Sequence, residues 1–150
     1  MERIGTWAND VDLSISPSKS QATLFTSNTH QAKYELNIHL GQARIPTDRF
    51  PKILGVTFNN LFSFTNHIDA VAAKARKRLH ILKALSGTDW GHSKETMLAT
   101  FKALIRPLFT YAAPIWYPNS SPTSISKLQR IQNAAIRVII GCHRLTAIAC

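Results

Sequence analysis

The sequence predicts an α+β chain in which a small strand-rich part precedes three amphipathic helices. Up to residue 64, short runs of strand-favouring residues alternate with turn residues. From residue 65 on, apolar residues recur every three or four positions over three long segments, which is typical of helices with one buried face. We therefore divide the chain into residues 1–64 and 65–150. A length of 150 residues and a hydrophobic fraction of 45% are sufficient for a folded core.

The strand-rich part contains one clear hairpin signal. Residues 34–40 (YELNIHL) alternate between apolar and polar side chains, as a half-buried strand does. Gly41 and Gln42 then form a turn into a short second arm at 43–45. Further strands are predicted at 21–27 (QATLFTS) and 53–58 (ILGVTF), and the residues before 10 fit the tail of a helix, although Gly5 argues against one.

The first predicted helix follows directly. Thr65 or Asn66 can cap its start, and it runs to about Ser86 with Gly87 as its C-cap. Its apolar positions follow a period of 3.6 residues, so they are expected to face the core. They are Ile68, Val71, Ala72, Ala75, Leu79, Leu82 and Leu85.

The second and third helices carry equally clear boundaries. Ser93 caps the second, and Pro107 is expected to kink or end it. Ser121 and Pro122 open the third, and Gly141 closes it. The positions expected to face the core are Met97, Leu98, Phe101, Leu104, Ile105 and Leu108 in the second helix and Ile125, Leu128, Ile131, Ala135, Val138 and Ile139 in the third.

Charge is the strongest indication of a partner. The chain has 18 basic and eight acidic residues, a net charge of +10, which favours a polyanion and nucleic acid above others. The alternative is a basic surface that binds nothing. Trp90, Trp116 and Tyr117 either stack on bases or, for the tryptophans, pack in the core. The cations expected to contact phosphates lie on the first predicted helix and are Lys74, Arg76, Lys77, Arg78 and Lys83.

The residues themselves offer no catalytic constellation. Cys142, His143 and Cys150 lack the spacing and the fourth ligand of a closed zinc site. Asp10 and Asp12 lie in a predicted turn, where solvated charges are a better interpretation than a metal site. No phosphate-binding glycine motif occurs. No metal site and no cofactor are therefore predicted for this chain.

The sequence also bears on location. Two cysteines make no disulfide framework and suit a reducing compartment. No apolar run approaches the ~20 residues that span a bilayer, and the N-terminus has no apolar signal-peptide core. We expect an intracellular protein, cytoplasmic or nuclear, without a membrane partner.

The order of several short motifs resembles the C-terminal part of the reverse transcriptase of non-LTR (LINE-like, jockey-type) retrotransposons. No single motif is specific, but five occur in the family's order along nearly the whole chain. They are Ser16-Pro17-Ser18-Lys19-Ser20 with the following Thr23-Leu24-Phe25, Ile53-Leu54-Gly55-Val56-Thr57, Phe64-x-x-His67-Ile68 through Lys74-Ala75-Arg76, Tyr111-Ala112-Ala113-Pro114-Ile115-Trp116, and Leu128-Gln129-Arg130-Ile131-Gln132-Asn133-Ala134-Ala135.

The resemblance implies a role for each part. Residues 1–64 would be a C-terminal palm remnant, and residues 65–150 a three-helix, thumb-like bundle that holds an RNA–DNA template–primer duplex through its backbone. Leu54, Gly55 and Val56 would form the primer grip, a hairpin that holds the growing 3′ end. Lys19 would contact nucleotide phosphates or act as a general acid; the alternative is a lysine on a turn.

Departures from the family are equally informative. The aromatic-alanine-Asp-Asp motif that binds two Mg²⁺ ions in the family does not occur here. The upstream palm and the fingers are also missing, so they become expected partners from the same polyprotein. Ser16 and Ile53 replace the family's usual asparagine and aromatic residue. These departures suggest a truncated or degenerate retroelement product, or a partial gene model, without polymerase activity alone.

Three hypotheses remain on sequence grounds. The first is part of an RNA-directed DNA polymerase that contributes the primer grip and the binding of template and primer. The second is a stand-alone basic module that binds nucleic acid. The third is a helical protein–protein adaptor whose charge is incidental. Salt-dependent binding to an RNA–DNA duplex separates the first two hypotheses from the third.

Overall fold

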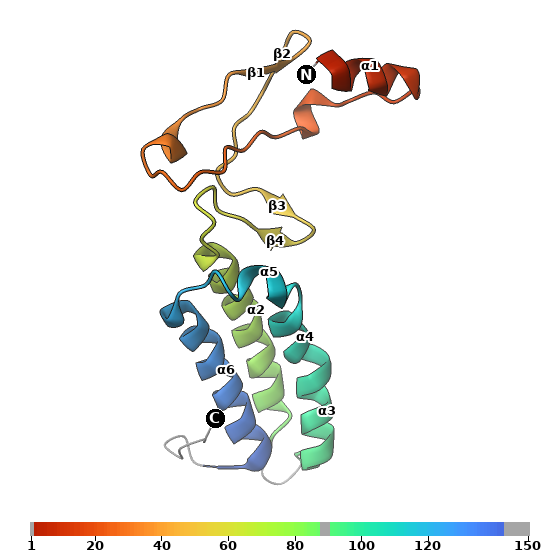
Figure 1. Ribbon diagram of the computed structural model, residues 1–150. Helices are drawn as coiled ribbons and strands as arrows, with labels where there is room; N and C mark the ends of the chain where they lie inside the picture. Colours follow the sequence, from red (N-terminus) through yellow and green to blue (C-terminus); the bar gives the residue numbers. More distant parts are fainter. Residues whose placement is uncertain (1, 88–90, 143–150) are drawn as a thin grey trace. The chain divides into compact units, whose positions relative to one another are not determined.

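The computed structural model describes residues 2–87 and 91–142 (Figure 1). The chain divides into two compact units, Met1–Ser63 and Phe64–Cys150. The first unit combines short helices with two small antiparallel sheets, and the second is helical throughout its described elements.

The first unit begins with helix α1 (Glu2–Asp10), which forms despite Gly5. Two single 3₁₀ turns follow, η1 (Pro17–Lys19) and η2 (Gln31–Lys33). Strands β1 (Ile38–Leu40) and β2 (Ala43–Ile45) pair in the predicted hairpin around Gly41, whose φ of +61° suits a residue without a side chain. A second antiparallel hairpin consists of β3 (Lys52–Ile53) and β4 (Val56–Thr57).

The predicted continuous strand 53–58 is wrong, because the chain reverses within it. Ile53 pairs with Val56, so Leu54 and Gly55 form a two-residue turn. Their φ angles are 47° and 84°, and positive values at both positions define the type I′ turn whose twist suits a hairpin. Leucine is an unusual residue at the first position, so the residue pattern predicted a strand, whereas the family resemblance implied a hairpin at residues 54–56.

The predicted strand at 21–27 is also wrong. Ala22 makes an isolated parallel bridge to Thr47, with the Ala22 N–H donating to the Pro46 carbonyl at 3.0 Å. Beyond this bridge the chain leaves the strand path. Phe25 stacks on Phe62, with ring centroids 5.1 Å apart, and meets Phe58 edge-on at 6.3 Å. Packing of aromatic rings therefore replaces a ladder of backbone hydrogen bonds in this segment.

The second unit is a bundle of three long helical segments with short connecting helices. Helices α2 (Thr65–Ala84) and α6 (Pro122–Ile140) run in the same direction, and α3 (Lys94–Leu104) runs against both (Figure 1). Helices α4 (Arg106–Thr110) and α5 (Ala113–Trp116) link α3 to α6. Every long helix packs against the other two.

Most predicted core positions of the bundle are buried, but not all. Leu98 and Leu104 are 42% and 36% exposed, so their assignment to the core is wrong. Helix α3 is broken at Ile105, before Pro107, and the two leucines lie outside the buried stripe. The buried apolar residues are Phe64, Ile68, Val71, Ala72, Ala75, Leu79, Leu82, Met97, Phe101, Ile105, Trp116, Leu128, Ile131, Ala135 and Ile139.

The helix ends largely follow their capping residues. The Ser93 hydroxyl accepts from the Thr96 N–H at 3.3 Å, and the Ser121 hydroxyl accepts from the Ser124 N–H at 3.2 Å. Gly141 ends α6 with a φ of +71°. The predicted C-cap Gly87 is wrong, because α2 already ends at Ala84. The Ser86 hydroxyl donates to the Lys83 carbonyl at 2.7 Å and satisfies one of the last acceptors there.

Candidate nucleic-acid interface

Positive charge is concentrated in the second unit. Residues 1–63 contain six basic and five acidic residues, whereas residues 64–150 contain twelve basic and three acidic ones. The helical unit thus carries nearly all of the excess charge. A polyanion would therefore be attracted to the bundle rather than to the strand-rich unit.

The five cations predicted on α2 do not share one side of the helix. The Arg78 guanidinium donates to the Leu104 carbonyl at the end of α3, so it caps that helix terminus and is half-buried. Lys74, Arg76, Lys77 and Lys83 are exposed. The predicted set therefore separates into a residue with a structural contact and four that can meet a ligand.

Helix α6 adds cations to the side of α2 that carries Arg76 and Lys83. The Lys127 ammonium donates to the Asp69 carboxylate at 2.5 Å and fixes which sides of α2 and α6 face each other. Arg76 and Lys83 follow Asp69 at intervals of seven residues and thus lie along the same side of α2. On α6 the equivalent stripe continues from Lys127 to Arg130, which is exposed, and Arg137, which is half-buried.

A shallow hollow confirms this arrangement at the other end of the two helices. It has a volume of about 220 Å³ and is lined by Lys83 of α2 and by Ala134, Arg137, Val138 and Cys142 at the end of α6. We call the surface formed by Arg76, Lys83, Lys127, Arg130 and Arg137 the α2–α6 basic face.

The basic face has dimensions that suit a nucleic-acid strand. From Asp69 to Lys83 the helix rises by about 21 Å at 1.5 Å per residue. One strand of B-DNA presents about six phosphates over that axial length. The three cations from α6 were not among the sequence-predicted residues, although Lys127, Arg130 and Arg137 have a helical spacing that could have indicated them.

The predicted primer-grip residues differ in accessibility. Leu54 is 86% exposed at the tip of the β3–β4 hairpin, beside Gly55. Val56 is 2% exposed, so its side chain is buried and only its backbone could reach a ligand. Lys19 is exposed in the 3₁₀ turn η1, where its N–H donates to the Ser16 carbonyl.

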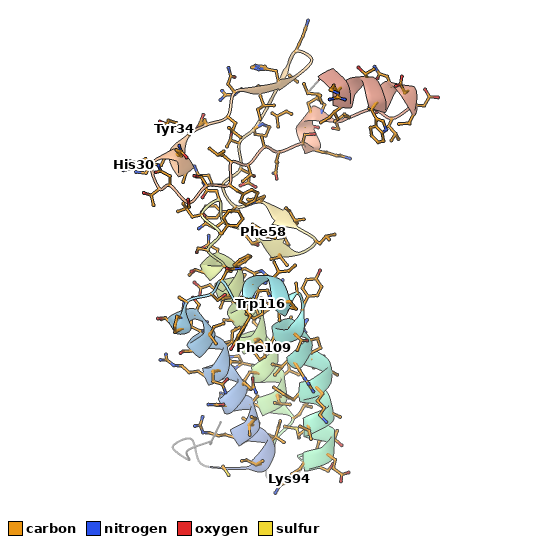
Figure 2. The ribbon with its side chains drawn as sticks, viewed as in Figure 1. His30, Tyr34, Phe58, Lys94, Phe109 and Trp116 are labelled. Carbon is orange, nitrogen blue, oxygen red and sulfur yellow. The ribbon has the colours of Figure 1, made fainter. Side chains whose placement is uncertain are left out.

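The aromatic candidates also differ. Trp116 is 2% exposed and its indole N–H donates to the Tyr111 carbonyl at 2.9 Å, so its interpretation as a core residue is confirmed (Figure 2). Tyr117 is 57% exposed and remains able to stack. Trp90, His143 and Cys150 lie outside the described residues.

A buried histidine lies beside Trp116. His67 is 5% exposed, and its ring centroid is 6.0 Å from that of Trp116. Burial, and to a smaller extent the positive charge of Lys74, holds the pKa of His67 below its usual value. This residue is therefore expected to be neutral at neutral pH, and it adds no charge to the bundle.

Comparison with known proteins finds sequence similarity to retrotransposon proteins. Over its full length the chain is 24% identical to a 115 kDa protein in type-1 retrotransposable element R1DM of Drosophila melanogaster. Over 94% of its length it is 24% identical to a D. melanogaster protein named as the RNA-directed DNA polymerase from transposon X-element, and over 93% it is 22% identical to the one named from transposon BS. The chain is related to non-LTR retrotransposon proteins.

This relationship confirms the resemblance inferred from the order of the motifs. The retrotransposon-related chain spans only 13% to 15% of the length of these relatives. No protein-family profile matches it, and no solved structure matches it. The assignment of palm, thumb and primer grip therefore remains a prediction from the sequence resemblance.

Within residues 2–87 and 91–142, no three side chains of histidine, cysteine, aspartate or glutamate are placed to hold one ion. Asp10 ends α1, and Asp12 follows in a turn with a φ of 54°. No helix in the described part of the chain is long and apolar enough to cross a membrane.

Proposed function

We propose that this chain is the C-terminal palm and thumb portion of a retrotransposon reverse transcriptase and that it binds the RNA–DNA template–primer duplex. The α2–α6 basic face carries this proposal, since it is a row of five cations on the unit that holds nearly all of the excess charge. Its contacts would be made to phosphates, which demand no sequence.

The primer grip is assigned to the β3–β4 hairpin. Leu54 presents a large apolar side chain to solvent from a left-handed backbone conformation, which costs about 1–2 kcal/mol for a residue other than glycine. Strained residues of this kind concentrate at ligand-binding positions. Gly55 beside it allows a close approach of a ligand to the backbone.

The chain alone is expected to lack polymerase activity. Nucleotide transfer of this class uses two metal ions held by carboxylates, and the described residues offer no such group. We assign the Mg²⁺ ligands to the upstream palm, which together with the fingers would be the partner of this chain. Primer-extension assays should therefore show no synthesis with or without Mg²⁺, and metal-dependent extension by the purified chain would contradict this assignment.

Binding to a labelled RNA–DNA duplex, followed by fluorescence anisotropy at several salt concentrations, tests the main proposal. Four to five phosphate contacts predict a slope of log K against log salt of about −4. Reversing charge with Arg76→Glu and Arg130→Glu should weaken binding at least about tenfold and reduce the slope by about two.

The matched control reverses two exposed charges on α3, with Lys94→Glu and Lys102→Glu. It changes the net charge equally but leaves the α2–α6 basic face intact, so its effect should be smaller. Equal losses in both variants would show that net charge, not this face, governs binding. If no binding occurs at low salt, the nucleic-acid proposal fails and the adaptor or non-binding hypothesis holds.

The hairpin assignment has a separate test. A photo-crosslinking residue at position 54 should label the primer 3′ end of the duplex more strongly than one at Gln42. The control position lies in the two-residue turn of the β1–β2 hairpin and is also exposed. Equal labelling from both turns would contradict the primer-grip assignment.

A further inference from the structure

A small pocket lies between the α5 segment and α6, on the helical unit. Its volume is about 120 Å³. Trp116 and Leu128, which are 2% and 6% exposed, form a buried apolar floor. The remaining lining residues are Phe109, Tyr117, Ile125, Gln129 and Gln132. Figure 2 shows Phe109 and Trp116 on the two neighbouring segments that contribute to it.

We infer that this pocket binds a single unstacked nucleobase of single-stranded nucleic acid. The inference rests on the proposed function, because it requires that the helical unit bind nucleic acid, but none of the residues that line the pocket belongs to the α2–α6 basic face. It also adds a ligand feature, the base itself, that phosphate contacts do not recognise.

The shape of the pocket is fixed before any ligand arrives. The indole N–H of Trp116 donates to the Tyr111 carbonyl at 2.9 Å, and the Ser120 hydroxyl donates to the Trp116 carbonyl. Tyr117 meets Trp116 edge-on, with centroids 6.2 Å apart. On α6 the Gln129 side-chain amide donates to the Asn133 side-chain oxygen at 2.9 Å. Little ordering is therefore needed on binding.

The lining residues select a flat heteroaromatic ring. By volume the pocket holds about four water molecules at ~30 Å³ each, which suits one ring system and excludes a helix or a sugar–phosphate segment. Tyr117, which is 57% exposed, offers an aromatic surface for stacking. The amide of Gln132 can donate to and accept from a polar ring edge. This combination is how proteins read unstacked bases.

The surroundings favour a base that is attached to phosphates. Arg106 is exposed on α4 one turn before Phe109. Ile125, Gln129 and Gln132 line the pocket from one side of α6. By helical spacing Lys127 lies roughly on the opposite side of α6, and Arg130 lies between the two sides. A strand that crosses α6 could thus place a phosphate on Arg130 and a base in the pocket.

The test compares a short labelled single-stranded oligoribonucleotide with an abasic oligonucleotide of equal length and charge. The natural chain should bind the base-containing strand about 5- to 150-fold more tightly, since stacking contributes about 1–3 kcal/mol per base. Tyr117→Ala should remove this preference and leave RNA–DNA duplex binding unchanged. Gln132→Leu, which replaces the amide by an apolar side chain of similar size, should reduce the preference.

Tyr111→Ala is the matched control. Tyr111 is 55% exposed, close to the 57% of Tyr117, and belongs to the same connector without lining the pocket. It should keep the preference for bases. If the natural chain binds the duplex but shows no base preference, or if both tyrosine variants behave alike, the pocket inference is overturned alone. If the natural chain binds neither strand nor duplex, the proposed function fails with it.

Discussion

The Asp69 carboxylate and the Lys127 ammonium lie 2.5 Å apart and join α2 to α6 across 58 residues of sequence. Their side chains are 51% and 35% exposed, so solvent screens the pair and its contribution to stability is about 0–1 kcal/mol. Its larger consequence is electrostatic. The pair neutralises one end of the α2–α6 basic face, so the uncompensated charge lies further along, at Arg76, Lys83 and Arg130.

Removing the acidic partner should therefore strengthen nucleic-acid binding. Asp69→Asn takes one negative charge from the face and releases Lys127 for a phosphate. We expect binding to the RNA–DNA duplex to tighten severalfold at low salt and the salt slope to steepen by about one. Glu95→Gln, an equal charge change in the first turn of α3, is the control measured by the same anisotropy titration. A similar gain from both variants would show that total charge alone is responsible.

The stability of the helical unit should depend on pH through His67. Its pKa in the folded chain is lowered, chiefly by burial, so the unfolded chain, with a histidine pKa of about 6.5, takes up the proton first. Stability is then complete above that pH and falls as the pH drops below it. Urea unfolding at neutral and mildly acidic pH, followed by the helical circular-dichroism signal, measures this loss.

The histidine variants identify the group responsible. His67→Gln should flatten the pH dependence in this range, whereas His80→Gln, an exposed position on the same helix, should leave it intact. If the His67 variant keeps the natural pH dependence, another group is titrating and the role given to burial is wrong.

The β3–β4 turn should become more stable when Leu54 is replaced by asparagine. Leu54 has a φ of 47°, a region that asparagine tolerates and that type I′ turns favour. Leu54→Asn should stabilise the hairpin by about 1 kcal/mol, and Leu54→Val should destabilise it because a branched side chain is disfavoured at positive φ. Hydrogen exchange of the backbone amides in residues 52–57 reports both effects. Lower protection in the asparagine variant would contradict this account.

The sequence predicted the helices better than the strands for a physical reason. Ser93, Ser121 and Gly141 act on backbone groups within a few residues of themselves, so their effect is visible in a short stretch of sequence. The path of segment 21–27 is instead set by the stacking of Phe25 on Phe62. These residues are 37 positions apart, so no local pattern indicates their contact. Leu54 is not a turn residue by type, so the residue pattern predicted a strand at 53–58, and only the resemblance to the retrotransposon family implied a hairpin there.

The candidate site was predicted in part for the same reason. Lys74, Arg76, Lys77 and Lys83 could be identified as exposed from the helical period alone. The hydrogen bond of Arg78 to the end of α3, and the position of Arg130 and Arg137 on the basic face, depend on how α2, α3 and α6 pack. Packing between segments more than 50 residues apart is set by the whole core, so a helix taken by itself cannot show it.

Trp116 should be the most sensitive single position among the aromatic residues of the connector. It is 2% exposed, contacts His67 and donates to the Tyr111 carbonyl. Trp116→Ala should lower the free energy of unfolding of the helical unit by about 3–5 kcal/mol. Trp116→Phe keeps most of the ring volume but leaves the carbonyl without the indole donor, so a loss of about 1–2 kcal/mol is expected.

Urea unfolding with far-ultraviolet circular dichroism measures these losses. Trp7→Phe serves as the control, because Trp7 is 59% exposed and its replacement should change stability by no more than about 0.5 kcal/mol. A Trp116→Ala variant as stable as the Trp7 control would mean that Trp116 is not a core residue. Trp116 also forms the floor of the base pocket. The Trp116→Ala variant should therefore lose the preference for a base-containing strand over an abasic one.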